Sequence, residues 1–295
     1  EEYARRTTPH LPGVHRKGIF LSNGSFFYRD AANSGAHLEL ATAEVTNPRD
    51  AVRMIEAGHC ILKGFLDGWK AENSFVKEAR FFRHSFDYLG DQSWATHMSI
   101  MTSTPRERIA AGLLPHLVSK VVLGGSGGFK PQANGNIEFC LSPRRYTFSR
   151  LDGGDNQGER ALIGERGSSH CSEGFSRLHL IGFESLCCHL GRYLDAGSTL
   201  LIMKMMDAGV DPASELLLRD PLGVLRTFAM DPLCRQQVSV GRGRKLTATQ
   251  IQGERVSAVL VGIGLNVSTA PPVPPTRFVP SVGSLADAGA RATWT

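Results

Sequence analysis

The alternation of strand-like and helix-like segments restricts the fold of this chain more than any other feature of its sequence. Residues 20–28 have the composition of a strand. Residues 48–65 ("PRDAVRMIEAGHCILKGF") carry apolar residues at helical spacing, with a proline in the first turn and Asn47 as a candidate cap. Residues 78–90 and 93–101 have the pattern of two strands joined by a polar turn that contains glycine. Segments of both kinds along one chain predict an α+β fold.

The second half of the chain continues the same pattern. Residues 106–124 predict a helix in which Pro115 marks a kink or a break. Residues 124–136 predict a glycine-rich loop. Residues 177–186 predict a further strand, and residues 187–209 form the most helix-like run of the chain.

Length and composition predict how these segments divide into domains. The chain has 295 residues, enough for one large domain with a smaller appendage. Its end is rich in proline and small residues, a composition typical of flexible segments. We therefore expect a large domain at residues 1–210, a small C-terminal domain at residues 211–256 and a flexible, proline-rich tail at residues 257–295.

Charge, hydropathy and cysteine spacing indicate the cellular compartment of the chain and the kinds of partner that it binds. No run of about 18 apolar residues is present, and nothing near residue 1 has the pattern of a secretory signal. The six cysteines show no CxxC pairing, which favours reduced thiols. The net charge of +5 permits an acidic partner without requiring nucleic acid. We therefore expect a cytoplasmic protein with no membrane or nucleic-acid partner.

One segment, "SNGSFFYRDAANSGAHLELATAE", gathers acidic and imidazole side chains beside an apolar strand. Strand alternation places Phe26, Tyr28 and Asp30 on one face, and His37 and Glu39 share a face if that stretch is also extended. Oxygen and imidazole ligands could then converge. Such oxygen-rich sites hold magnesium, which prefers carboxylates together with nucleotide phosphates.

A second set of candidate ligands lies in or beside other predicted strands: Asp87, His97, His170 and His179. Spacing alone leaves an alternative open for both sets. Asp30 could cap the turn after its strand, Glu39 and Glu44 could be solvated, and the histidines could be ordinary hydrogen-bonded side chains.

The segment "SNGSFFYRDAANSGAHLELATAE" resembles a motif of the Pup ligase and Pup deamidase (depupylase) family. The family's pattern is N-G-x-R-x-Y-x-D, a short spacer and H-P-E-Y-x-x-x-E. The matching residues here are Asn23, Gly24, Tyr28, Asp30, His37, Glu39 and Glu44. Three further blocks, at residues 82–100, 115–127 and 165–185, are similar to the family's motifs and follow in its order. Together the blocks cover roughly residues 18–254.

The resemblance implies a glutamine-synthetase-like fold, in which helices back a curved antiparallel sheet whose concave face holds ATP and magnesium. It implies that Asp30 is the catalytic residue. The residues that it implies as metal ligands are Glu2, Tyr28, Glu39, His97 and His170. The residues that it implies as nucleotide contacts are Thr42, Arg166 and Arg177.

The implied activity is an ATP-dependent ligase that joins the C-terminal glutamate of a small, disordered, acidic Pup-like modifier to lysines of protein substrates, through a glutamyl-phosphate. A basic groove around Arg144 and Arg145 would suit such a modifier. The turn from Gly124 to Gly128 would give the backbone freedom where the nucleotide passes. Two alternatives stay open: the hydrolytic branch, which removes the modifier or deamidates its terminal glutamine, and a paralogue that only binds it.

Two departures from the family pattern bear on these alternatives. Phe26 stands where the family has an arginine, and Met98 stands where it has a glutamate. Methionine cannot bind magnesium as a carboxylate does. Both departures favour weakened catalysis or a protein that only binds the modifier.

Overall fold

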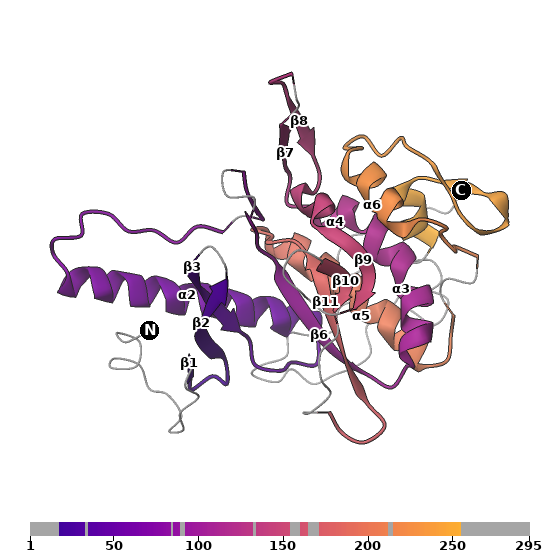
Figure 1. The fold of residues 1–295 in the computed structure, drawn as a ribbon. Helices are drawn as coiled ribbons and strands as arrows, with labels where there is room; N and C mark the ends of the chain where they lie inside the picture. Colours follow the sequence, from indigo (N-terminus) through magenta and orange to yellow (C-terminus); the bar gives the residue numbers. More distant parts are fainter. Residues whose placement is uncertain are drawn as a thin grey trace, which may run out of the picture.

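The computed structural model describes residues 18–32, 35–83, 85–88, 92–131, 134–153, 160–164, 171–211 and 215–254 (Figure 1). The tail expected at residues 257–295 lies outside this part of the chain. Helices and sheets are both present, and the expected α+β fold is confirmed.

The chain opens on a three-stranded antiparallel sheet of order β1-β2-β3, formed by Gly18–Phe20, Phe26–Ala32 and Gly35–Ala41. The single strand predicted at residues 20–28 is therefore wrong, because a tight turn divides it. The Leu21 amide donates to the Ser25 carbonyl at 2.8 Å, and Gly24 has a φ of 82°, which favours glycine.

A long helix, α2 (Pro48–Glu72), follows and covers one side of this sheet (Figure 1). Asn47 caps it by accepting a hydrogen bond from the Asp50 amide at 2.9 Å, as predicted. The helix continues beyond residue 65 because no proline interrupts a stretch composed mostly of helix-forming residues. Its apolar face packs on a small core made by Ile19, Leu21, Phe27, Leu40, Ile61, Leu62 and Phe65.

The second sheet is larger and has the order β6-β11-β10-β9. Its strands are β6 (Thr96–Thr102), β9 (Phe148–Gly153), β10 (Arg160–Gly164) and β11 (Ser176–Phe183). Neighbouring strands are antiparallel except β9 and β10, which are parallel. Helices α3 (Arg106–Ser119) and α5 (His189–Asp207) share its largest core, with Leu113 and Met203 nearly or fully buried against Leu178 and Leu180.

Two short hairpins differ from the sequence prediction. Residues 78–83 form no strand, and only β4 (Phe86–Asp87) pairs with β5 (Gln92–Ser93). The loop expected at residues 124–136 instead contains β7 (Gly128–Pro131), which pairs with β8 (Ile137–Cys140) in a hairpin that projects from the body (Figure 1).

The break in the third helix falls at Lys120, five residues after Pro115. Helix α3 includes Pro115, and the short helix α4 (Val121–Gly124) starts after Lys120. A proline inside a helix removes one backbone hydrogen bond but does not always end the helix.

The C-terminal part consists of α6 (Pro221–Ala229), β12 (Val238–Ser239), the 3-10 turn η2 (Gly241–Gly243), β13 (Lys245–Leu246) and helical residues 248–254. Its core also contains Val121 of α4, and Leu225 of α6 packs with Val118, Phe148, Leu162 and Ile181. The division at residue 210 stays a prediction. None of the helices in the described ranges is long and apolar enough to cross a membrane.

Candidate functional site

The register of β2 and β3 places the candidate site residues on one side of the first sheet. Tyr28 lies opposite Glu39, and Asp30 lies opposite His37. Residues directly opposite each other in an antiparallel pair project to the same side. The predicted faces are therefore confirmed. Leu40 projects to the other side, toward α2, and the site side remains open.

Asp30, His37 and Glu39 form a compact cluster of half-buried side chains. One ligand atom from each lies within 4.8 Å of the others. The Nε2 atom of His37 is 3.5 Å from Oδ2 of Asp30. Sequence alternation made this cluster predictable, because it depends only on two extended segments meeting in register.

The donor set of this cluster fits a divalent cation that also binds phosphate. Two carboxylates supply the hard oxygen ligands that Mg²⁺ and Mn²⁺ prefer. The single imidazole is a common ligand of first-row transition-metal ions. These three side chains leave the remaining coordination positions of the ion unfilled. Those positions stay open to water or to the oxygens of a ligand.

An aromatic row adjoins the cluster on the same side of the sheet. The ring centroids of Phe20 and Phe26 are 4.6 Å apart, and those of Phe26 and Tyr28 are 5.1 Å apart with nearly parallel planes. Phe26 therefore packs directly against Tyr28. Phe26 stands where the family pattern has an arginine. Its ring packs against Tyr28, and it carries no positive charge that could bind phosphate.

A pair of histidines lies on the second sheet. The rings of His97 and His179 meet edge to face with centroids 5.1 Å apart, and Ser99 Oγ lies 3.0 Å from His179 Nδ1. Arg177 lies two residues before His179 on β11, so its side chain projects to the same face. Trp94, two residues before β6, has its ring centroid 6.4 Å from that of His37 of β3. His97 is not part of the Asp30 cluster.

Met98 lies on the opposite side of β6 and packs against the main core. The side chain at residue 98 thus projects away from His97, and the effect of this methionine on metal binding stays a prediction. Of the two departures from the family pattern, only Phe26 lies on the site face.

The remaining predicted residues are dispersed. Thr42 follows β3 and is exposed, as is Glu44. Glu2, Arg166 and His170 lie outside the described residues.

The expected basic groove at Arg144 and Arg145 is contradicted by their burial. Their exposed fractions are 0% and 1%. Arg144 donates to the Ile181 carbonyl at 3.0 Å, and Arg145 donates to the Ser142 carbonyl at 2.6 Å. Both guanidinium groups also lie over aromatic rings. A charge pattern in sequence does not reveal that an arginine is anchored in the interior in this way.

The glycine-rich turn has a packing role. A Cβ on Gly124 would lie 2.5 Å from Oδ1 of Asp195, and one on Gly125 would lie 2.5 Å from the Leu141 carbonyl oxygen. These glycines allow close approach of neighbouring elements. The expectation of a nucleotide passage here has no support in this packing.

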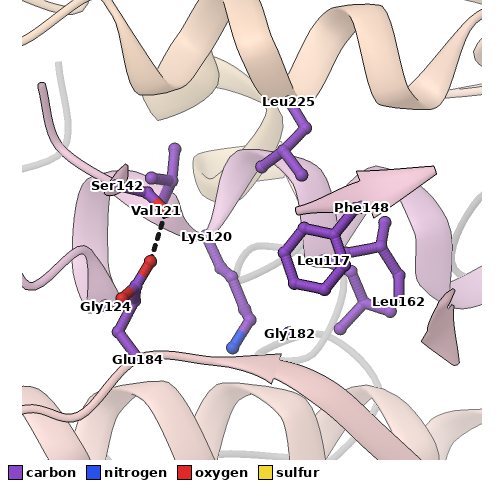
Figure 2. Close-up of a pocket in the computed structure, with 10 residues that line it drawn as sticks. All are labelled: Leu117, Lys120, Val121, Gly124, Ser142, Phe148, Leu162, Gly182, Glu184 and Leu225. Carbon is purple, nitrogen blue, oxygen red and sulfur yellow. Dashed lines mark hydrogen bonds between the residues drawn. The ribbon is translucent and has the colours of Figure 1, made fainter. Parts of the chain in front are cut away.

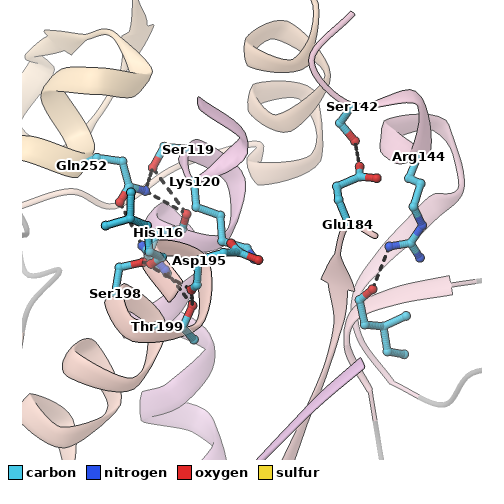
Figure 3. A network of polar contacts seen from close by, with 12 residues as sticks. His116, Ser119, Lys120, Ser142, Arg144, Glu184, Asp195, Ser198, Thr199 and Gln252 are labelled. Carbon is cyan, nitrogen blue, oxygen red and sulfur yellow. Dashed lines mark hydrogen bonds and ion pairs between the residues drawn. The ribbon is translucent and has the colours of Figure 1, made fainter. Parts of the chain in front are cut away.

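Beside this turn lies a pocket that sequence reasoning missed (Figure 2). Apolar side chains line most of it, together with Lys120, Ser142 and Glu184, and Ser142 donates a hydrogen bond to Glu184. Lys120 Nζ is 2.7 Å from Oδ1 of the buried Asp195 (Figure 3). Burial lowers the pKa of Lys120 and raises that of Asp195. A lysine within an apolar helical run was the signal available in the sequence.

Comparison with known proteins gives consistent matches. Residues 2–264 match the family described as Pup-ligase protein. A depupylase of Acidothermus cellulolyticus is 32% identical over 240 residues, covering 80% of this chain and 46% of that protein. A Pup–protein ligase of Geodermatophilus obscurus is 30% identical over 242 residues, covering 80% of this chain and 52% of that protein. The structure of the Pup ligase PafA in complex with ADP matches with a TM-score of 0.72 at 23% identity, covering 92% of this chain and 57% of that one.

The fold and the site together define an α+β protein that shares the fold of PafA and carries an acidic cluster on one side of a sheet. The family match covers most of the chain, and relatives at 30% identity or more cover 80% of it. The chain belongs to the Pup-ligase protein family. It spans about half the length of the curated relatives that it matches.

Proposed function

We propose that this protein is an ATP-dependent ligase that joins the C-terminal glutamate of a small, disordered, acidic Pup-like modifier to lysines of protein substrates. The observation that carries the proposal is the Asp30, His37 and Glu39 cluster on an open sheet face, in a chain of the Pup-ligase family. The solved PafA structures contain ADP in one case and Pup in another, which supports a nucleotide and a modifier as ligands.

In this proposal the chain's own residues bind and orient the reactants. Magnesium would be held by Glu39 and Tyr28, together with His97. Glu2 and His170, which lie outside the described residues, are the other proposed ligands. ATP, when bound, would supply the phosphoryl group for activating the modifier's terminal carboxylate as a glutamyl-phosphate, with ADP as the leaving group. Thr42, Arg166 and Arg177 are the proposed nucleotide contacts, since guanidinium groups fit phosphate oxygens.

Asp30 is the proposed catalytic residue. Its carboxylate is half-buried on the open side of β2 and would accept a proton from the incoming lysine ammonium. The amine then attacks the activated carbonyl, phosphate leaves, and an isopeptide bond forms. His37 Nε2 lies 3.5 Å from Oδ2 of Asp30 and orients this carboxylate. The Asp30 side chain stays half-exposed to solvent.

A hydrolase is the second candidate. Relatives at 32% and 30% identity are named depupylase and Pup deamidase/depupylase, so both activities occur among similar chains. In that case Asp30 would activate water or act as the nucleophile toward the modifier's terminal amide or isopeptide.

The first test measures ADP formation by the purified protein with magnesium, ATP and a peptide that ends in glutamate. Asp30→Asn is the test variant, and Asp67→Asn, at an exposed position of α2, is the matched control. A ligase produces ADP that depends on the peptide, and only Asp30→Asn abolishes it.

The same preparation is then given a peptide that ends in glutamine and a preformed isopeptide. Ammonia or free modifier without peptide-dependent ADP would replace the ligase with the hydrolase. If neither activity appears while the peptide still binds, the paralogue that only binds the modifier is correct.

A further inference from the structure

We propose that one turn of α2, residues 56–59, positions the acidic cluster by fixing β3 against the body of the protein. Gly58 in this turn contacts the back of β3, and Glu56 ties the same turn to α5. The inference rests on the proposed function only in taking the cluster as a cation site.

Gly58 lies directly against the side chain of Leu40. Gly58 is the only buried residue of α2. A Cβ at this position would lie 2.1 Å from Cδ2 of Leu40, so any side chain there must displace that leucine. Leu40 follows Glu39 in β3, and the two side chains project to opposite sides of the sheet. The Leu40 side chain is thus the contact through which this turn of α2 holds β3, and with it Glu39.

Glu56 anchors this turn through its carboxylate. It pairs with the buried guanidinium of Arg192, and its Oε2 lies 3.2 Å from His189 Nε2. Arg192 is itself fixed, because its Nε donates to the Leu186 carbonyl at 2.7 Å. Both basic residues belong to the first turn of α5, so Glu56 joins the two helices.

His59 extends the anchor to the segment after α2. Its Nδ1 lies 3.3 Å from Oε1 of Glu56, and its Nε2 lies 2.7 Å from NH1 of Arg83. Arginine can only donate, so Nε2 accepts from Arg83 and the ring proton of neutral His59 sits on Nδ1, the nitrogen that faces Glu56. Burial, followed by the charge of Arg83, lowers the pKa of His59, in agreement with a neutral ring.

Helix α5 connects this anchor to the second sheet. Ile202, Met203 and Met206 of α5 are buried in one core with Ile100 of β6 and Leu178 of β11. Through α5, the turn at residues 56–59 thus connects the strand that carries Glu39 to the sheet that carries His97. Its residues touch no ligand of the cluster and act as positioning residues.

The test measures Mn²⁺ binding by electron paramagnetic resonance in the full chain. Outer residues that orient ligands typically change metal affinity by about 10–100-fold. We expect Glu56→Gln and Gly58→Val each to weaken Mn²⁺ binding by about tenfold. Lys63→Ala, on the exposed side of α2, should bind Mn²⁺ as the wild type does.

A rescue separates positioning from general loss of structure. Gly58→Ala adds one methyl group against Leu40, and Leu40→Ala in the same chain removes the obstruction. The double variant should bind Mn²⁺ as tightly as Leu40→Ala alone. Gly58→Ala alone should bind Mn²⁺ less tightly than the wild type does. Urea unfolding of each variant shows whether the chain is folded, and the rescue pair provides the test if Glu56→Gln does not fold.

The outcomes are distinct. Wild-type protein that binds Mn²⁺, loses it in Glu39→Gln and keeps it in Glu56→Gln and Gly58→Val overturns the positioning role alone. Wild-type protein that binds no Mn²⁺ overturns both this role and the cation site of the proposed function.

Discussion

At the scale of single residues, strand alternation decides which side chains share a face of the site, and burial decides which charged groups are held in the interior. Tyr28, Asp30 and Glu39 share a face because two extended segments pair, and that follows from a period of two residues. Arg144 and Arg145 look like a surface patch in sequence but are held in the interior. The Ile181 carbonyl comes from a strand distant in the chain, whereas Ser142, Tyr146 and Phe148 are near neighbours. No local pattern records that both arginines are buried.

The buried pair of Lys120 and Asp195 gives the first prediction at this scale. Their side chains are 5% and 3% exposed. Lys120→Met leaves Asp195 as an uncompensated buried charge, and we expect it to reduce the free energy of unfolding by about 3–5 kcal/mol. Adding Asp195→Leu removes that charge and should recover most of the loss. Urea unfolding of both variants checks this, and a double variant less stable than Lys120→Met would contradict it.

Asp207 gives a prediction that depends on pH. Its Oδ1 accepts hydrogen bonds from Thr102, Ser103 and Thr104, including one of 2.6 Å from Thr102 Oγ1. Burial alone would raise the pKa of Asp207, but these hydrogen bonds outweigh it, and the pKa is lowered. A lowered folded-state pKa stabilises the protein above the unfolded value of about 3.9 and loses this effect as the pH falls through the folded value.

Asp207→Ala should therefore be less stable than the wild type at pH 7 by about 1–2 kcal/mol, which is the scale of losing hydrogen bonds to a charged acceptor. The difference should shrink at pH 3, below the unfolded value of about 3.9, because the unfolded chain there binds a proton that the folded carboxylate resists. Urea unfolding at the two pH values provides the measurement. A difference that is equal at both would mean that the charge of Asp207 has no part in it.

At the scale of elements, helical periodicity predicted the long helices well, and their ends and joints less well. Helix α2 and helix α5 follow from apolar spacing. The break at Lys120 does not, because Pro115 is the visible signal and the actual break accompanies a side chain directed to Asp195. Residues 78–83 have strand-like composition but pair with no neighbour in the described part of the chain. Pairing partners are a tertiary property, which composition cannot supply.

The joint between the C-terminal helical residues and α3 gives a prediction at this scale. Gln252 lies against the fully buried His116, with Oε1 3.1 Å from Nδ1, and its Nε2 donates to the His116 carbonyl and to Ser119 Oγ (Figure 3). His116 Nε2 continues to Thr199 of α5 at 3.0 Å. Gln252→Leu removes these bonds and leaves buried polar groups without them, a loss of about 1–3 kcal/mol.

We expect faster amide hydrogen exchange over residues 248–254 in Gln252→Leu, with little change in α2, because the loss is local to one joint. Thr249→Ala, at an exposed position of the same helical stretch, is the control. Unchanged exchange in the variant would show that apolar packing alone holds these residues.

At the scale of the whole molecule, the expected division at residue 210 separates segments that share buried cores. Phe228 and Ile251 are fully buried in a cluster that includes Val121, and Leu225 packs with Val118 and Phe148. The composition of residues 211–256 suggested a unit of its own. Sequence patterns report whether a segment can fold, but which side chains it buries elsewhere depends on the assembled structure.

A chain that ends at residue 210 tests this packing. Removing the C-terminal part would expose apolar side chains of α3, α4, β9 and β10, including Leu162, which is 2% exposed in the intact protein. Burying one such side chain stabilises a protein by about 1.5–3 kcal/mol, and several would be lost together against a typical total of about 5–15 kcal/mol. The intact chain should unfold in one cooperative calorimetric transition, and the shortened chain should show none near that temperature. Two separate transitions in the intact chain, with the lower one absent after truncation, would instead indicate independent domains. In that case the shared cores would contribute little, and the acidic cluster should keep its Mn²⁺ affinity without the C-terminal part.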